Sequence, residues 1–392
     1  MDYSEFRVNF KDFDRPRPIG VSGILRMMND EEFLESSIES CVNCLDELIV
    51  VYNETSPESL GIINRMKCKY PDKIRVYKYL PKLYNGNLSQ EEFDAAKKLP
   101  PDSIHLLANY YNYALSKCRY RYVMKIDSDQ IYYTEKLQII VERYRSMQTN
   151  ASCKFIDCFA FLLFLFYAVC LLKLHIPPFV ALSKWSDKLF SGYFKVVLHL
   201  IQKYKIPVSL SGFNLYIPPP RKKLSCVERE SKDIYIPLGK NLSNSRAISS
   251  PFNGIGDHPI FKMCSDTYFV PYICPEYDKS NGRQRSIIER LYNVKNLLPV
   301  GVCWAHFSSN RSCNSEDQQG KFKSYPNYFL NLKKIEKVNN AIHDQIFRYS
   351  GAWDAYQQKY YHLVSFSLNE SFITWLSFFM LDRQGKIRHI IE

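Results

Sequence analysis

The stretch "YVMKIDSDQIYY", residues 122–133, carries a strand pattern directly into two acidic residues. Five mostly apolar residues precede Asp127 and Asp129, and only Ser128 separates the two carboxylates. An isolated Asp-Ser-Asp is a common turn, because Asp and Ser favour turns and caps. Paired carboxylates are also the oxygen ligands that Mg²⁺ and Mn²⁺ prefer. The motif alone leaves both interpretations open, with Ser128 as a tight connector in either.

The hundred residues before this stretch alternate between strand-like and helix-like patterns. The strand-like runs are 20–27, 46–53, 73–80 and 120–127, and the helix-like segments between them are 29–45, 56–70 and 103–119. The first helix is expected to use Asn29 or Asp30 as its N-cap, and Pro57 suits the first turn of the second. Such alternation predicts βαβ units and a parallel sheet, whose ligands bind beyond the carboxyl ends of the strands. Asp127 and Asp129 fall at that end.

Three ordered blocks of this chain resemble the GT-A-fold glycosyltransferases of the family 2 type. The blocks are "VSGILRMMNDEEFLESSIES" (21–40), "DELIVVYNETSP" (46–57) and "YYNYALSKCRYRYVMKIDSDQ" (110–130), and the resemblance covers about residues 18 to 135. A weaker similarity to capsule and lipopolysaccharide transferases continues through "NGIGDHPIF" (253–261). The resemblance implies an α/β, Rossmann-like GT-A fold with a mixed, mainly parallel sheet flanked by helices.

The resemblance also implies a nucleotide-sugar site with a divalent metal, Mn²⁺ or Mg²⁺, bridging the donor's diphosphate. By position, Asp127 and Asp129 would hold that metal, with Asp127 also near the ribose. The residues that fall where family members contact base, ribose and phosphates are Arg26, Met28, Asn29, Tyr52, Asn53, Asn112 and Asp127. The chain departs from the family at Tyr52 and Tyr111, where the family often has Asp and Arg, so the nucleotide base stays open with UDP preferred.

Two later residues complete the expected site. Asp257 in "NGIGDHPIF" matches the place of the family's catalytic base, which would accept the proton of the acceptor hydroxyl in an inverting transfer. The alternative for Asp257 is a plain helix N-cap, because an acidic residue there could open a helix. His306 in "VGVCWAHF" (300–307) is a candidate third metal ligand, against the alternative of a structural histidine.

Net charge and cysteine content narrow the range of expected binding partners and cellular compartments. The chain of 392 residues has a formal net charge of +12, which favours an anionic partner such as a phosphorylated substrate or an acidic membrane surface. Its basic residues form no stripe and no nucleic-acid motif, so nucleic acid is not expected. The twelve cysteines are scattered, and Cys41 and Cys44 lie in a helix-like segment without further zinc ligands. With no signal-peptide pattern at the start, a reducing, cytoplasmic compartment is expected.

A hydrophobic segment interrupts the predicted enzyme domain. Residues 158–172, "CFAFLLFLFYAVCLL", form an uncharged run shorter than the about 20 residues that span a bilayer. Residues 181–205 then interleave lysines with large apolar residues, which suits an interfacial helix on anionic lipid. The alternative is a helical hairpin packed on the domain itself or on a second subunit, which would make 155–205 a homo-oligomer interface. The predicted organisation is 1–150 for nucleotide-sugar binding, 151–206 for a helical insertion, 207–312 for acceptor binding and 313–392 for a helical extension.

The sequence therefore predicts an inverting, metal-dependent hexosyl- or N-acetylhexosaminyltransferase. Its donor would be a nucleotide diphosphate sugar, and its acceptor a cell-surface polysaccharide or lipid-linked saccharide at the inner face of the cytoplasmic membrane. A sugar-phosphate nucleotidyltransferase is the second enzyme class, disfavoured because "RMMNDEEF" (26–33) lacks a Gly-rich phosphate loop. A non-catalytic, basic membrane-associated protein is the third alternative.

Overall fold

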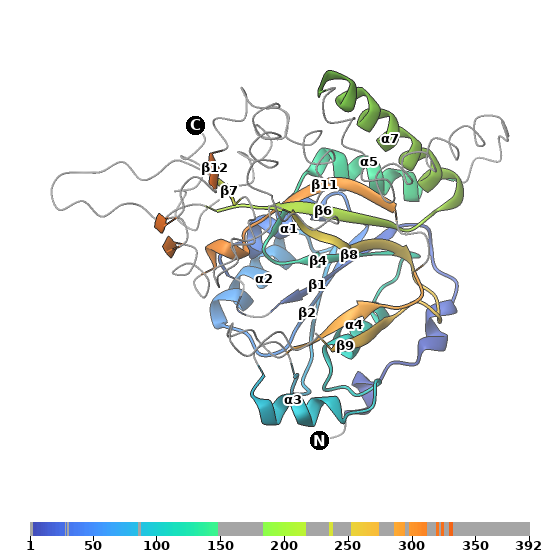
Figure 1. Ribbon diagram of the computed structural model, residues 1–392. Helices are drawn as coiled ribbons and strands as arrows, with labels where there is room; N and C mark the ends of the chain where they lie inside the picture. The colour runs from blue at the N-terminus through green and yellow to red at the C-terminus, as the bar shows by residue number, and fades with distance from the viewer. Residues whose placement is uncertain are drawn as a thin grey trace.

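The computed structural model describes residues 3–27, 29, 31–84, 88–147, 183–216, 235–237, 252–273, 286–294, 298–311, 319–320, 323–324 and 329–331. Within these ranges, eight strands form one sheet (Figure 1). Their order across the sheet is β3 (Ile74–Lys78), β2 (Glu47–Tyr52), β1 (Val21–Met27), β4 (Tyr122–Asp127), β8 (Phe252–Lys262), β6 (Val208–Asn214), β11 (Leu298–His306) and β5 (Gln130–Tyr132).

The sheet is mixed and mainly parallel. β3, β2, β1 and β4 pair in parallel, and so do β6 and β11, whereas β8 runs antiparallel to both β4 and β6. β5 returns antiparallel to β11. The register aligns Arg26 with Asp127 and Met27 with Tyr52, so the ends of three parallel strands meet at one edge. The predicted α/β architecture with a mixed, mainly parallel sheet is confirmed.

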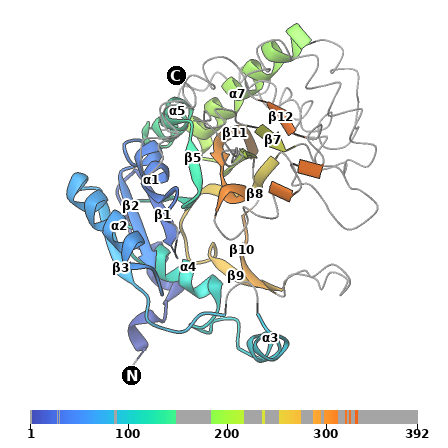
Figure 2. The ribbon, with the colours of Figure 1, turned by 90° about the vertical axis from the view of Figure 1, so that its left-hand side faces the viewer.

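Helices cover both faces of this sheet. α1 (Leu34–Val42), α2 (Pro57–Lys69) and α5 (Thr134–Arg145) pack on one face, and α4 (Leu107–Ser116) packs on the other with the hairpin of β9 (Phe269–Ile273) and β10 (Ile287–Leu291). Figure 2 shows α4 beside that hairpin. Met124 and Ile126 of β4 pack with the first group and Val123 with the second. Because side chains alternate along a strand, Lys125 and Asp127 face the α4 side.

Local capping accounts for the helix boundaries. Ser56 caps α2 through its hydroxyl, which accepts from the Ser59 amide, and Pro57 occupies the first turn as predicted. The prediction that Asn29 caps the first helix is wrong, since α1 begins at Leu34 after a turn. Asn29 instead adopts φ 48° and accepts a 2.7 Å hydrogen bond from the Ser56 amide, so it joins the start of α1 to the start of α2. Asp30 lies outside the described residues.

Three segments differ from the sequence-based expectation. Helix α3 (Gln90–Lys97) lies between the predicted elements, where no helix was predicted, and Ser89 and Glu92 form a capping box at its start. Asp257 lies within strand β8, so it does not open a helix. In the extension expected to be helical, the short strand β12 (Phe329–Asn331) pairs antiparallel with β7 (Tyr235–Pro237). The hydrophobic run 158–172 and most of the extension lie outside the described residues.

The predicted basic helix of the insertion is α7 (Ser183–Tyr204). Val197 and Ile201 are fully buried in the core that also holds Leu137 and Val141 of α5, and Figure 1 shows α7 against α5. The second half of α7 therefore packs on the domain itself, which is the alternative to an interfacial helix. Among the residues described, no helix has the length and apolarity to cross a membrane.

Candidate active site

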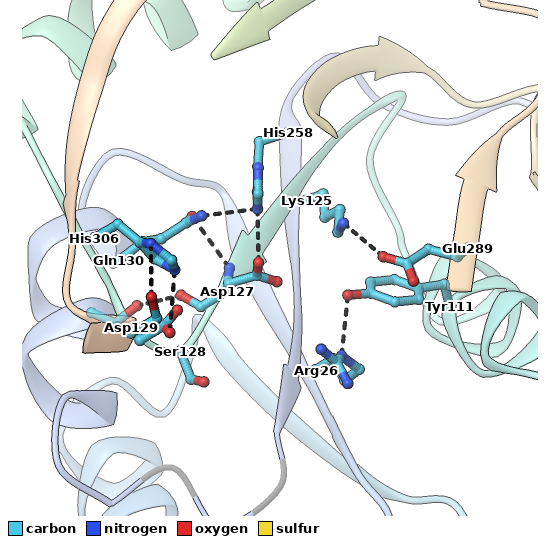
Figure 3. Close-up of polar contacts among 12 residues, drawn as sticks. Arg26, Tyr111, Lys125, Asp127, Ser128, Asp129, Gln130, His258, Glu289 and His306 are labelled. Atoms are coloured by element: carbon cyan, nitrogen blue, oxygen red, sulfur yellow. Dashed lines mark hydrogen bonds and ion pairs between the residues drawn. The ribbon is translucent and has the colours of Figure 1, made fainter. Parts of the chain in front are cut away.

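The Asp-Ser-Asp turn lies where β4 ends and β5 begins. Asp127 is the last residue of β4, Ser128 and Asp129 form the turn, and Gln130 opens β5. β5 pairs Gln130 directly with His306 at the end of β11. The Phe307 amide then donates to the Asp129 carbonyl at 3.0 Å, which fixes the chain after β11 against the turn. Residues far apart in sequence thus surround the two carboxylates (Figure 3).

One carboxylate oxygen of Asp129 contacts both a histidine and an arginine. Its Oδ2 lies 3.3 Å from Nε2 of His306 and 3.1 Å from Nε of Arg311. The side chain of Asp129 is only 8% exposed, whereas that of Arg311 is 29% exposed. Burial alone would raise the pKa of Asp129, but His306 and Arg311 outweigh burial and lower it. Asp129 is therefore a carboxylate anion held by the last residue of β11 and by the segment that follows it.

His306 is oriented in the way a metal ligand requires. Its Nδ1 lies 2.6 Å from Oδ1 of Asn214, at the end of β6, and donates to that oxygen in the neutral tautomer. Nε2 then carries a lone pair toward the Asp129 carboxylate, a contact that is favourable only with a proton or a cation between them. Two neighbouring ligands of one octahedral ion, each about 2.1 Å from it, lie about 3 Å apart. The Asp129–His306 spacing fits such a pair.

Asp127 does not join this pair. Among the residues that the structure describes, no three His, Cys, Asp or Glu side chains form a metal-binding group, so the predicted set of Asp127, Asp129 and His306 is not assembled. Oδ2 of Asp127 lies 2.9 Å from Nε2 of His258 on β8. Burial by itself would raise the pKa of Asp127, but His258, Lys125 and Arg26 together hold it well below its ordinary value.

His258 shares its contact nitrogen between two neighbours. Nε2 of Gln130 also lies 2.9 Å from Nε2 of His258. The Tyr132 hydroxyl donates to Oε1 of Gln130 at 2.6 Å, which orients the amide with its nitrogen toward His258. One ring nitrogen cannot donate to Asp127 and accept from Gln130 at the same time. The proton position on His258 therefore decides which of the two contacts is a hydrogen bond.

A buried charged group lies beside Asp127 on the α4 face. Nζ of Lys125 forms a 2.7 Å ion pair with Glu289 of β10, with 2% and 9% of the two side chains exposed. Nζ also lies 5.2 Å from the centre of the Tyr111 ring, whose hydroxyl accepts a 3.2 Å hydrogen bond from Nε of Arg26. Figure 3 shows this group next to the Asp-Ser-Asp turn. Lys125 and Arg26 thus bring positive charge to the carboxyl edge of β4 and β1.

The expected donor contacts divide into two sets. Arg26, Tyr52 and Asp127 share the carboxyl edge, and Met28 lies outside the described residues. Three asparagines are engaged elsewhere in the fold. Nδ2 of Asn53 donates to the carbonyls of Tyr79 and Pro81. Oδ1 of Asn29 accepts from the Ser56 amide. The side-chain amide of Asn112 pairs with the Phe269 backbone by two 2.8 Å hydrogen bonds.

The geometry of Asn112 shows a structural role. It is 1% exposed, and its amide both donates to the Phe269 carbonyl and accepts from the Phe269 amide. This pairing mimics one rung of a β-ladder and fixes β9 on α4. The predicted donor contact through Asn112 is not supported, because these backbone groups take up its carbonyl oxygen and one amide hydrogen.

Asp257 is placed only by its backbone. It precedes His258 in the part of β8 where the register with β6 shifts, between the pairs Leu210–His258 and Gly212–Asn253. Such bulges redirect side chains and are frequent beside active sites. The side chain of Asp257 is outside what the structure describes, so its role as base stays a prediction.

Sequence reasoning missed several residues that surround the two carboxylates. These are Lys125, Gln130, Glu289 and Arg311. Lys125 carried a usable signal, because a lysine inside an otherwise apolar strand needs a buried counter-charge. Glu289 and Arg311 carried none, since each depends on a tertiary contact.

Known proteins resemble this chain only distantly. A scan against protein-family models finds no match, and a search of curated proteins finds none. Among solved structures, glucosyl-3-phosphoglycerate synthase from Mycobacterium tuberculosis, in complex with Mn²⁺, UDP-glucose and phosphoglyceric acid, is 17% identical, with a TM-score of 0.21 and coverage of 36% of this chain and 44% of that chain. A second structure of that enzyme is 17% identical, with a TM-score of 0.22 and coverage of 36% and 45%.

The matched part spans less than half the length of each of these structures. Similarity at this level assigns neither a family nor an activity to this chain. Functional inference therefore depends on the geometry of the Asp-Ser-Asp turn and its partners.

Proposed function

We propose that this protein is a metal-dependent glycosyltransferase that uses a nucleotide diphosphate sugar. The observation that carries the proposal is the pair of Asp129 and His306, 3.3 Å apart at the carboxyl edge of a GT-A-type sheet. Mg²⁺ and Mn²⁺ sites of this kind use one or two protein ligands and complete their shell with substrate phosphates and water. A nucleoside diphosphate at this edge would supply those phosphates.

In this proposal Asp129 and His306 hold the metal. Asn214 keeps His306 in the required tautomer through its 2.6 Å contact with Nδ1. When bound, the metal acts as a Lewis acid that neutralises charge on the leaving nucleoside diphosphate. The Asp127 side chain is 26% exposed. The carboxylate can therefore contact His258 through one oxygen and still reach the donor's ribose. Arg26 adds positive charge beside the diphosphate, whereas the charge of Lys125 is paired with Glu289.

The finer assignments extend the same proposal. The transfer would be inverting, with Asp257 accepting the proton of the acceptor hydroxyl. Tyr52, at the end of β2, would stack on the base, for which uracil is preferred. A hexose or N-acetylhexosamine would move to a polysaccharide or lipid-linked acceptor. The inner-membrane location and a homo-oligomer through 155–205 stay predictions, motivated by the basic and apolar residues of that segment.

A donor screen tests the proposal. UDP-, GDP- and ADP-sugars are added with and without Mn²⁺, and donor hydrolysis is measured for the wild type and for Asp129→Asn. We expect hydrolysis of one donor class that depends on the metal and is lost in the variant. No hydrolysis and no metal-dependent nucleotide binding in the wild type would contradict the proposed function.

The base requires a separate variant. Asp257→Asn should bind donor and metal as the wild type does, yet transfer sugar at least about 100-fold more slowly, because general-base catalysis contributes about 10²–10⁴-fold. Near-normal transfer would reject Asp257 as the base and leave the metal-dependent chemistry intact.

A further inference from the structure

We infer that Arg311 and the divalent metal compete for Oδ2 of Asp129, and that metal binding transfers the Arg311 guanidinium to the donor's diphosphate. The inference rests on the proposed function and adds to it an anion-binding residue and an order of binding. Arg311 belongs to none of the sequence motifs described above. It follows β11 by five residues, directly after a 3₁₀ turn at Ser308–Asn310.

The guanidinium lies across the Asp-Ser-Asp turn. Its Nε is 3.1 Å from Oδ2 of Asp129, and its Nη2 donates to the Ser128 hydroxyl at 3.2 Å. These two contacts place a positive charge on the oxygen that also faces His306 at 3.3 Å. In the structure, Arg311 therefore neutralises the anion that a metal would otherwise neutralise.

Arg311 and a metal ion at the same oxygen exclude each other. A cation held by Asp129 and His306 would lie about 2.1 Å from Oδ2 of Asp129. A guanidinium on that oxygen would then lie about 4–5 Å from a doubly charged ion, and like charges at that separation repel in a partly buried site. Arg311 must leave Asp129 when the metal binds, and the metal must displace it.

The backbone of this segment stays in place while the side chain can move. The Phe307 amide is held by the Asp129 carbonyl at 3.0 Å, and the Phe307 ring stacks on Phe33 with centroids 5.0 Å apart. The Arg311 amide donates to the Ser308 carbonyl at 3.3 Å. The Arg311 side chain is 29% exposed, so a rotamer change frees its head without moving the turn.

The donor's diphosphate is a suitable anionic ligand for the released guanidinium. A diphosphate coordinated to the metal would lie next to Asp129, a few ångströms from the place that Arg311 leaves. The planar fork of arginine matches phosphate oxygens in bidentate geometry, and such charge-assisted pairs are stronger than neutral hydrogen bonds. The same residue thus opposes metal binding before the donor arrives and stabilises the donor afterwards.

The variant Arg311→Gln separates these two effects because they have opposite signs. Mn²⁺ binding without nucleotide is measured by electron paramagnetic resonance, and UDP and GDP binding by calorimetry at saturating Mn²⁺. We expect Mn²⁺ to bind about 3- to 10-fold more tightly to the variant, because a competing ion pair is removed. We expect the diphosphate that the wild type binds to bind about 10-fold more weakly, because a charge-assisted contact is lost.

A matched control is Arg65→Gln, which removes an arginine from a surface pair with Glu35 far along α2 and should change neither affinity. Unchanged or weaker Mn²⁺ binding in Arg311→Gln would overturn the exchange. Unchanged diphosphate binding would overturn the second half of the inference. A wild type that binds neither Mn²⁺ nor a nucleoside diphosphate would instead refute the proposed function, so the two failures are distinguishable.

Discussion

Asp127 and Asp129 are two residues apart, yet their partners differ in kind. The partners of Asp129 are His306 and Arg311, whose side chains are 12% and 29% exposed. Asp127 contacts His258 and lies beside Lys125, and each of these has only 2% of its side chain exposed. The partly exposed Arg311 can leave when a metal binds Asp129 and His306, whereas the buried Lys125 and His258 cannot leave without a large desolvation cost. The turn therefore joins an exchangeable side, Asp129 with Arg311, to a permanent side, Asp127 with His258 and Lys125.

The largest expected effect is on the exchangeable side. Asp129→Asn should lower kcat/KM by at least about 100-fold and abolish Mn²⁺ binding, because it removes the charge that holds the metal. The free energy of unfolding should fall by about 1–3 kcal/mol, because the amide keeps the volume of the buried side chain but loses its charge-assisted contacts. Steady-state kinetics and urea unfolding measure both quantities. A variant that is inactive only because it unfolds would remove the contrast between the two sides.

Substitutions on the permanent side should lower the free energy of unfolding. Lys125→Met leaves Glu289 without its counter-charge at 9% exposure, so we expect a loss of about 3–5 kcal/mol in the free energy of unfolding. The double variant Lys125→Met, Glu289→Leu should recover much of that loss, because no buried charge then remains. Urea unfolding of the single and double variants measures the coupling. Equal stability of both variants would show that the pair is not coupled.

A smaller effect is expected where β9 is fixed to α4. Asn112→Ala leaves the buried amide and carbonyl of Phe269 unpaired, which should cost about 1–3 kcal/mol of unfolding free energy. Nucleotide affinity, measured by calorimetry below the unfolding transition, should stay within about 3-fold of the wild type. If affinity falls while stability does not, the donor contact implied by the family resemblance is correct and the structural role is not.

The smallest effect belongs to the connector of the turn. Ser128 contacts Arg311 through its hydroxyl, so Ser128→Ala removes one hydrogen bond to a partly exposed side chain. We expect kcat/KM to change by less than about 5-fold, since one such bond contributes about 1 kcal/mol. A loss as large as that of Asp129→Asn would mean that Ser128 contacts the substrate.

Local pattern predicted the first half of the fold well. The four parallel strands, three of the helices and the place of Asp127 at a strand end all follow from periodicity and turn residues between 20 and 130. Helix α3 was predictable too, because Ser89 and Glu92 form a capping-box pair at the usual spacing. The position of Asn29 could not be predicted, because its φ of 48° and its contact with Ser56 arise from the packing of two loops.

The second half depended on pairing between distant segments. A Gly-rich stretch that could equally open a helix became β8, because it adds to the edge of β4 and pairs with β6 on its other side. β12 likewise forms through its partner β7 in a segment with helical periodicity. Tertiary context overrides local preference in both cases.

The sequence by itself determined that two carboxylates follow a buried strand at the ligand-binding edge of an α/β sheet. Only the tertiary structure decided what each carboxylate meets. His258 is 131 residues from Asp127, and Arg311 is 183 residues from Ser128. Periodicity reports which face of an element is buried, but it carries no information about which distant element covers that face. The division between an exchangeable Asp129 and a fixed Asp127 therefore arises from how β8 and β11 pack beside the turn.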